Sequence, residues 1–75
     1  MTLKFMAEVA LGREIDDDEF FQATIKAKNK QARIYAREGR AEVKRLEYLA
    51  QLVKEAIVEA EFSKLTLRVC EVVNG

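Results

Sequence analysis

The sequence contains no histidine and no proline, and it has only one cysteine and three glycines. The missing histidines remove the commonest general base and the commonest metal ligand together. Cys70 has no histidine to activate it as a nucleophile, and the only serine, Ser63, has no base near it in the sequence. Three scattered glycines cannot form a glycine-rich phosphate loop. The sequence therefore predicts a protein that is not an enzyme and that needs no cofactor.

Long apolar runs are also missing, since the longest are only a few residues and a membrane span needs about 20. The N-terminus lacks the basic, apolar and small-residue zones of a secretory signal. The single cysteine, Cys70, cannot form an internal disulfide and fits a small buried hydrophobe. These features favour a cytoplasmic protein. With 75 residues, 49% of them hydrophobic and 35% charged, we expect one small helical domain over residues 1–75.

Two groups of carboxylates have spacings that also occur in metal sites. The run from Asp16 to Glu19 lies at a helix start, where successive side chains point about 100° apart and cannot converge on one ion. Glu55 and Glu59 are four residues apart, but carboxylate-bridged metal helices normally add histidines from neighbouring helices. We therefore expect no metal site in this chain.

The stretch from Ile15 to Phe20 carries three signals for the start of a helix. Asp16 is a suitable N-cap, and Glu19 can reach back to the backbone N–H of that cap. Ile15 and Phe20 have the spacing of a hydrophobic staple. Two further aspartates place negative charge at the positive end of the helix dipole. We predict a helix that begins at residue 16.

Residues 2–11 fit two structures. Five apolar residues alternate as on a half-buried strand: Leu3, Phe5, Ala7, Val9 and Leu11. Good helix formers also recur here at helical spacing, and Thr2 and Gly12 are able to cap the two ends of such a helix. The unbroken alternation favours the strand, and Gly12 marks a break in either case.

Residues 16–62 contain no proline and one glycine, and they follow a heptad seam typical of a coiled coil. The seam starts at Phe21 and Ile25. Its middle has polar residues or glycine at several seam positions, and it ends in a broad apolar face. That face consists of Leu46, Leu49, Ala50, Val53, Ala56, Ile57 and Ala60.

Two architectures suit this seam. One continuous helix would be about 70 Å long and would need other chains to cover it. A hairpin that turns near Gly39 would let residues 16–37 and 41–62 bury each other. The continuous helix loses about 1 kcal/mol at its interior glycine, and the hairpin loses a similar amount because its second helix lacks a cap residue. The seam lacks apolar residues around residues 39–42, and this favours the hairpin.

Residues 63–73 change to a period of two and are rich in β-formers, which predicts a second strand that needs a partner. The order of an N-terminal strand followed by helices is similar to that of ribbon–helix–helix repressors. The acidic run after the first strand and the strand at the end depart from that pattern, so no residue roles are transferred from that family.

The net charge is zero, but its distribution is uneven. Residues 8–19 carry six acids and one base, a net of −5, whereas residues 26–45 carry eight bases and two acids, a net of +6. Six of these bases recur at intervals of four and three residues and form what we call the basic stripe: Lys26, Lys30, Arg33, Arg37, Arg40 and Lys44.

The basic stripe fits an ordinary solvated face, and it also fits a surface for phosphates or for an acidic partner. On a continuous helix it would cover roughly 80° of arc. It contains no aromatic or amide side chain, and the sequence shows no DNA-reading motif, so any nucleic-acid binding would be non-specific. The opposite charges of the two segments could instead set the register of self-association between antiparallel chains.

These patterns predict a mainly α protein: a long helical hairpin, or one long kinked helix, from about residue 16 to 62, with short terminal strands completed by dimerisation. The predicted protein interface consists of Phe21, Ile25, Leu46, Leu49, Val53 and Ile57. We expect a small regulatory or adaptor protein that acts through contacts with itself and with another protein. The alternative is a non-specific nucleic-acid-binding accessory protein, and the small size also suits an accessory protein of a phage or plasmid.

Overall fold

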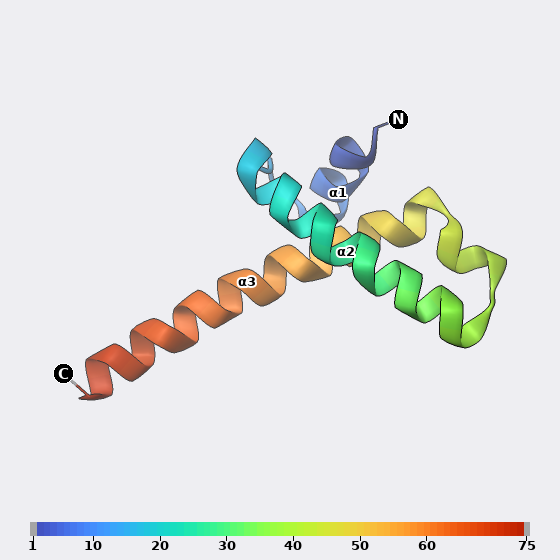
Figure 1. Cartoon of the computed structure of the whole chain (residues 1–75). Coiled ribbons are helices and arrows are strands. Elements are labelled where there is room, and N and C mark those ends of the chain that lie inside the picture. The colour runs from blue at the N-terminus through green and yellow to red at the C-terminus, as the bar shows by residue number, and fades with distance from the viewer. Residues whose placement is uncertain (1, 75) are drawn as a thin grey trace.

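The computed structural model describes the backbone of residues 2–74 and the side chains of residues 2–64. Three α-helices follow one another, with a short 3₁₀ helix, η1, before the last (Figure 1). Their bounds are α1 Leu3–Leu11, α2 Asp17–Glu38, η1 Ala41–Lys44 and α3 Leu46–Asn74. The predicted mainly α fold class is confirmed, and residues 2–74 contain no strand.

The prediction of a strand at residues 2–11 is wrong, because these residues form α1. Thr2 caps the helix, its Oγ1 accepting a hydrogen bond from the N–H of Phe5 at 3.2 Å. Gly12 ends the helix with a left-handed φ of 86°, a conformation that glycine adopts without strain. Ala7 is fully buried against the core, whereas Phe5 and Val9 are 51% and 66% exposed. A strand would have placed all three on its buried face. The helix instead buries Ala7 alone of the three, and its packing against the core stabilises the helical form.

The start of α2 lies where the sequence predicts it, with Asp16 in extended conformation at the N-cap position. The Asp16 side chain makes no capping hydrogen bond, so that part of the prediction is wrong. Ile15 is buried, and Phe20 packs against the same hydrophobic cluster. The entry of the chain into α2 is therefore fixed by apolar packing more than by the cap.

The long helix is interrupted at Gly39, which has a left-handed φ of 67° and whose N–H bonds the carbonyl of Tyr35 at 2.7 Å. After it come η1 and an extended Arg45, so that the next helix starts at Leu46. Gln31 of α2 donates from Nε2 to the carbonyl oxygen of the buried Val43 at 2.6 Å, which fastens η1 to α2. The structure thus excludes one continuous helix through this region.

The predicted full-length hairpin of residues 16–37 and 41–62 is not confirmed. Helices α2 and α3 do contact each other, but they cross rather than lie side by side along their lengths (Figure 1). Two features of the chain explain this arrangement. Residues 41–44 belong to η1 and are lost to the second helix, and α1 packs on part of the apolar face of α3.

The strand predicted for residues 63–73 is also wrong, since α3 continues as a helix to Asn74. With residues 2–11 helical, a strand there would have no partner, and its backbone N–H and C=O groups would be left unpaired. A helix satisfies those groups within itself. Figure 1 shows this end of α3 extending away from the other helices.

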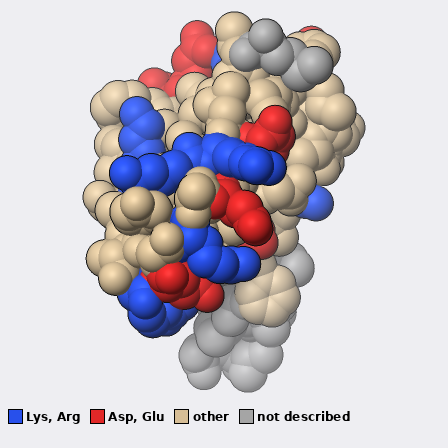
Figure 2. All heavy atoms as spheres, turned by 90° about the vertical axis from the view of Figure 1, so that its right-hand side faces the viewer, with Lys and Arg blue, Asp and Glu red and all other residues tan. Residues whose placement is uncertain are grey.

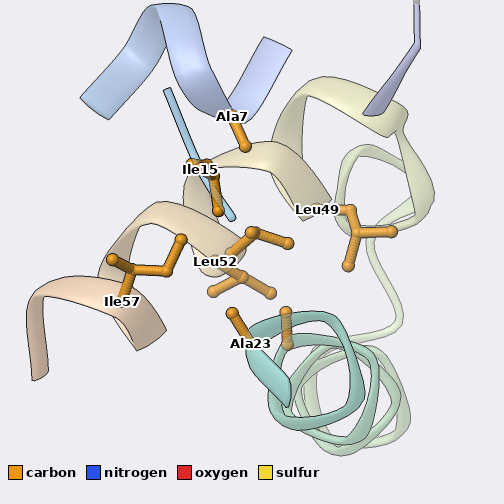
Figure 3. Packing of buried hydrophobic residues seen from close by; sticks show 8 residues of the cluster. Ala7, Ile15, Ala23, Leu49, Leu52 and Ile57 are labelled. Carbon is orange, nitrogen blue, oxygen red and sulfur yellow. The ribbon is translucent and has the colours of Figure 1, made fainter. Parts of the chain in front are cut away.

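The core lies where α1, the link before α2, and α2 all meet α3 (Figure 3). The buried side chains of α1 and α2 are all alanines, namely Ala7, Ala23 and Ala27. The buried side chains of α3 are larger: Leu49, Leu52, Val53 and Ile57. Alanines at a helix crossing let the backbones approach closely, and the larger side chains of α3 then fill the space between them. None of the described helices is long and apolar enough to cross a membrane.

Candidate protein interface

The six residues of the predicted interface do not share one surface. Leu49, Val53 and Ile57 are buried within the chain itself, in the core around α3. Phe21 and Ile25 of α2 are 62% and 45% exposed. Leu46, at the start of α3, is also exposed but belongs to a different helix. Of the six, Phe21 and Ile25 on α2, and separately Leu46 on α3, therefore remain available to a partner.

Pairs of large exposed apolar residues occur on all three α-helices. Each pair is separated by four residues, so its members are neighbours on one helical face. The pairs are Phe5 and Val9 on α1, Phe21 and Ile25 on α2, and Val58 and Phe62 on α3. The prediction missed the first and last pairs. The i,i+4 spacing of the first would have been visible if residues 2–11 had been taken as helix, and the last lies within the predicted helix of residues 41–62 and could have been found there.

The apolar pair of α2 has a charged residue at each end. Asp18 lies three residues before Phe21, and Lys28 lies three residues after Ile25. All four side chains are exposed, and we call them the outer face of α2. Within residues 2–64, neither Asp18 nor Lys28 takes part in an ion pair.

A different set of charges holds the chain's own elements together around Arg13, in the link between α1 and α2. Its guanidinium donates two hydrogen bonds, each 3.1 Å, to the two carboxylate oxygens of Glu19. It also bonds the carboxylate of Glu61 on α3 and donates to the carbonyl of Glu14 at 2.9 Å. This fork joins the first turn of α2 to α3.

These contacts shift the pKa values of the groups involved. Hydrogen bonds from Arg13 are the main reason that the pKa of Glu19 lies below its ordinary value of 4.5, and the backbone N–H of Asp16 lowers it further. Lys4 on α1 bonds Asp17 at 2.5 Å, which lowers the pKa of Asp17 and raises that of Lys4. Because the Asp17 side chain is 90% exposed, water and salt screen this second pair strongly.

The residues of the basic stripe have separate surroundings. Lys30 lies 3.7 Å from Glu55 on α3. Beyond the break at Gly39, Arg40 pairs with Glu38 at 3.3 Å, and Lys44 stacks over the ring of Tyr35 at 4.2 Å. Figure 2 shows the end of the molecule where α2, η1 and α3 meet, and acidic side chains are interspersed there among the basic ones. The stripe is therefore not one continuous basic surface.

Three stripe residues have neither an ion pair nor a ring contact in the described part of the chain, namely Lys26, Arg33 and Arg37. Lys26, Lys30 and Arg33 line one wall of a groove of about 240 Å³, whose other wall carries Glu55 and Glu59 of α3. A larger groove of about 450 Å³ shares Lys26 with it and continues towards the start of α2. Because both grooves contain acids and bases together, neither is selective for one sign of charge.

No group of three or more metal-ligating side chains comes together among the residues the structure describes. The comparisons with protein-family models, with curated proteins and with solved structures found no match, so the functional argument depends on the surfaces described above.

Proposed function

We propose that the protein acts through protein–protein contacts, as a homodimer, in a regulatory or adaptor role and without catalysis. The observation that supports this is the exposure of Phe21 and Ile25 side by side on α2. Single exposed apolar residues are normal on any protein. Adjacent aromatic and branched side chains, repeated as pairs on three helices of so small a chain, indicate surfaces that a partner covers.

The size of the core supports the same proposal. The fully buried side chains are small or medium in size, and the largest of them are Ile57, Val43 and Val53. A domain of this length buries a smaller fraction of its surface than a larger one, and association is one way to bury more. A partner that covers the apolar pairs would therefore add to stability as well as to function.

Sedimentation equilibrium at micromolar concentration tests the homodimer. We expect a species of twice the 8.6 kDa chain mass that dissociates on dilution. Circular dichroism on the same samples should show helical content at every concentration. A folded species that stays monomeric up to the highest soluble concentration would contradict the proposal.

A second candidate is non-specific nucleic-acid binding, and Lys26, Arg33 and Arg37 favour it because they are exposed without ion pairs in the described part of the chain. Its weakness is that Lys30, Arg40 and Lys44 of the same stripe already have partners. Binding to duplex DNA or RNA across a salt series separates the two candidates. A steep loss of affinity with salt would support phosphate contacts, whereas no binding at low salt would exclude this function.

A further inference from the structure

We propose that a second copy of the chain docks antiparallel on the outer face of α2, with Asp18 of one copy facing Lys28 of the partner subunit. The same arrangement places Phe21 of each copy against the partner's Ile25. The proposal rests on the homodimer proposed above and identifies the surface through which it forms.

The four residues of the outer face lie on one side of α2. They are separated by three, four and three residues, which is the spacing of the a and d positions of a coiled coil. At about 100° per residue they fall within roughly 80° of arc. The buried residues of α2, Ala23 and Ala27, point instead into the core beside α3. The outer face is thus a separate seam that the chain's own core does not use.

One antiparallel register matches this seam with itself. When Phe21 faces the partner's Ile25, two-fold symmetry places Ile25 against the partner's Phe21. One layer further out, on each side, Asp18 then faces the partner's Lys28. The pattern of acid, two apolar residues and base is therefore complementary to its own reverse, with apolar layers in the middle and an ion pair at each end.

Other arrangements of the same face match poorly. A parallel pair would place Asp18 against the partner's Asp18 and Lys28 against the partner's Lys28, and like charges repel at both ends. Sliding the antiparallel pair by one heptad would place Ile25 against the partner's Lys28 and would separate the two ion pairs. The charged residues therefore select one orientation and one register.

The charges that the proposal uses are available for a partner. Neighbouring acids of the first turn are already engaged, Asp17 with Lys4 and Glu19 with Arg13. Asp18 and Lys28 are exposed and have no ion pair within the described side chains. Polar side chains border the seam, with Gln22 and Asn29 exposed beside it. An apolar centre with a polar rim is the usual composition of a protein interface.

The expected affinity is modest. From Asp18 to Lys28 the seam spans about 15 Å of helix, at 1.5 Å per residue. A contact of this length falls at the small end of protein interfaces, where association is weak and transient. We expect dissociation constants in the micromolar range or weaker, which makes association sensitive to single charge reversals.

Two charge reversals test the pairing. In Asp18→Lys, two lysines face each other at both ends of the seam, and in Lys28→Asp two aspartates do. Each variant alone should dimerise at least about tenfold more weakly than the wild type. An equimolar mixture should recover near wild-type association, because a chain with two lysines pairs with a chain with two aspartates at both ends. The readout is sedimentation equilibrium of each variant and of the mixture.

Lys26→Asp is the matched control, since it makes the same change on α2 away from the outer face and should leave dimerisation nearly unchanged. Circular dichroism checks that every variant is folded, and recovery in the mixture cannot come from a change in folding of either chain. If the wild type dimerises and both reversals dimerise equally well, the surface is wrong and the homodimer stands. If the reversals weaken the dimer but the mixture does not recover, the antiparallel pairing is wrong. A monomeric wild type would overturn the homodimer itself.

Discussion

Arg13 shows how one side chain can join parts of the chain that are distant in sequence. Its guanidinium bonds Glu19 at the start of α2 and Glu61 on α3, 48 residues away. The fork of an arginine suits two carboxylates at once, because several N–H groups point outward in one plane. No local pattern in the sequence predicted this contact. It depends on a link between α1 and α2 that brings residue 13 beside α3.

The first prediction concerns Arg13→Gln and pH. Hydrogen bonds from Arg13 keep the pKa of Glu19 below its ordinary value of 4.5 in the folded chain. A lowered folded pKa stabilises the fold above the unfolded value, and that stabilisation is lost as the pH falls through the lower, folded pKa. The wild-type melting temperature should therefore fall on acidification below about pH 4.5. Arg13→Gln should melt lower at pH 7 and should show a smaller further fall.

Melting curves of both proteins between pH 7 and pH 3 make this comparison. Lys26→Gln serves as a control, since it also removes one exposed positive charge but lies outside the outer face of α2 and has no ion pair with a described carboxylate. Parallel pH profiles for Arg13→Gln and the wild type would show that the fork contributes nothing to acid stability.

The second prediction concerns Thr24, whose Oγ1 is buried on α2 and has no hydrogen-bond partner among the described residues. A buried hydroxyl without a partner costs about 1–3 kcal/mol of desolvation. Thr24→Val keeps the branched shape, and the two residues have similar helix propensities. The variant should be more stable by about 1 kcal/mol in urea unfolding. Thr24→Ser, which keeps the hydroxyl and loses a methyl group, should be less stable, and equal stability of all three would contradict the assignment.

At the scale of elements, the sequence predicted what local chemistry determines. The start of α2 and the breaks at Gly12 and Gly39 follow from neighbouring residues, and the structure has them at the expected positions. Residues 2–11 and 63–73 were misassigned because their apolar residues fit periods of both two and 3.6. Packing against α3 favours the helix in the first segment. In the second, a strand would have no partner strand within residues 2–74, which favours the helix there too.

The candidate interface was only partly predictable for a related reason. The broad apolar face of residues 46–60 was assigned to a partner chain, whereas α1 and α2 of the same chain cover most of it. Which helix covers which face depends on the crossing of α2 and α3, and hence on η1. The sequence pattern around residues 39–45 does not specify that geometry, since it lacks a recognisable helix-start signal.

The third prediction separates core from surface on α3. Ile57 is 1% exposed within the hydrophobic cluster, whereas the adjacent Val58 is 45% exposed. Ile57→Ala should lower the free energy of unfolding by about 2–5 kcal/mol, because it leaves a cavity in a close-packed core. Val58→Ala should change it by less than about 0.5 kcal/mol. Urea unfolding at a concentration below dimerisation measures both, and similar losses would mean that α3 is oriented differently in solution.

At the scale of the whole molecule, the fold partly neutralises the uneven charge of the sequence. The crossing of α2 and α3 places Lys30 beside Glu55, and η1 brings Glu42 within 3.8 Å of Arg40. Exposed pairs of this kind contribute little to stability, yet they reduce the positive potential that residues 26–45 would otherwise present. The exposed cations of α2 that keep no ion pair among the described side chains are Lys26, Lys28, Arg33 and Arg37.

The last prediction concerns the salt dependence of the proposed dimer. In the proposed antiparallel register, the acidic residues 17–19 of one copy lie opposite residues 27–29 of the partner subunit, and the basic residues that follow, Arg33 and Arg37, lie further along the same helix. The attraction between these opposite charges is long-range and exposed, so salt should screen it. The dissociation constant should therefore rise between about 0.05 M and 0.5 M NaCl, where the Debye length falls well below 10 Å. Sedimentation equilibrium across that range measures the slope.

The double reversal Arg33→Glu/Arg37→Glu should flatten that slope while leaving helicity nearly intact, since neither arginine has an ion pair in the described part of the chain. It should weaken the dimer less than Asp18→Lys, because both arginines lie outside the outer face of α2 and act only through the field around it. If the dissociation constant of the wild-type dimer did not change with salt, we would attribute the stability of the dimer to Phe21 and Ile25 alone. An unchanged slope in the double reversal would show that the uneven charge of the sequence is only a solvated surface, with no part in assembly.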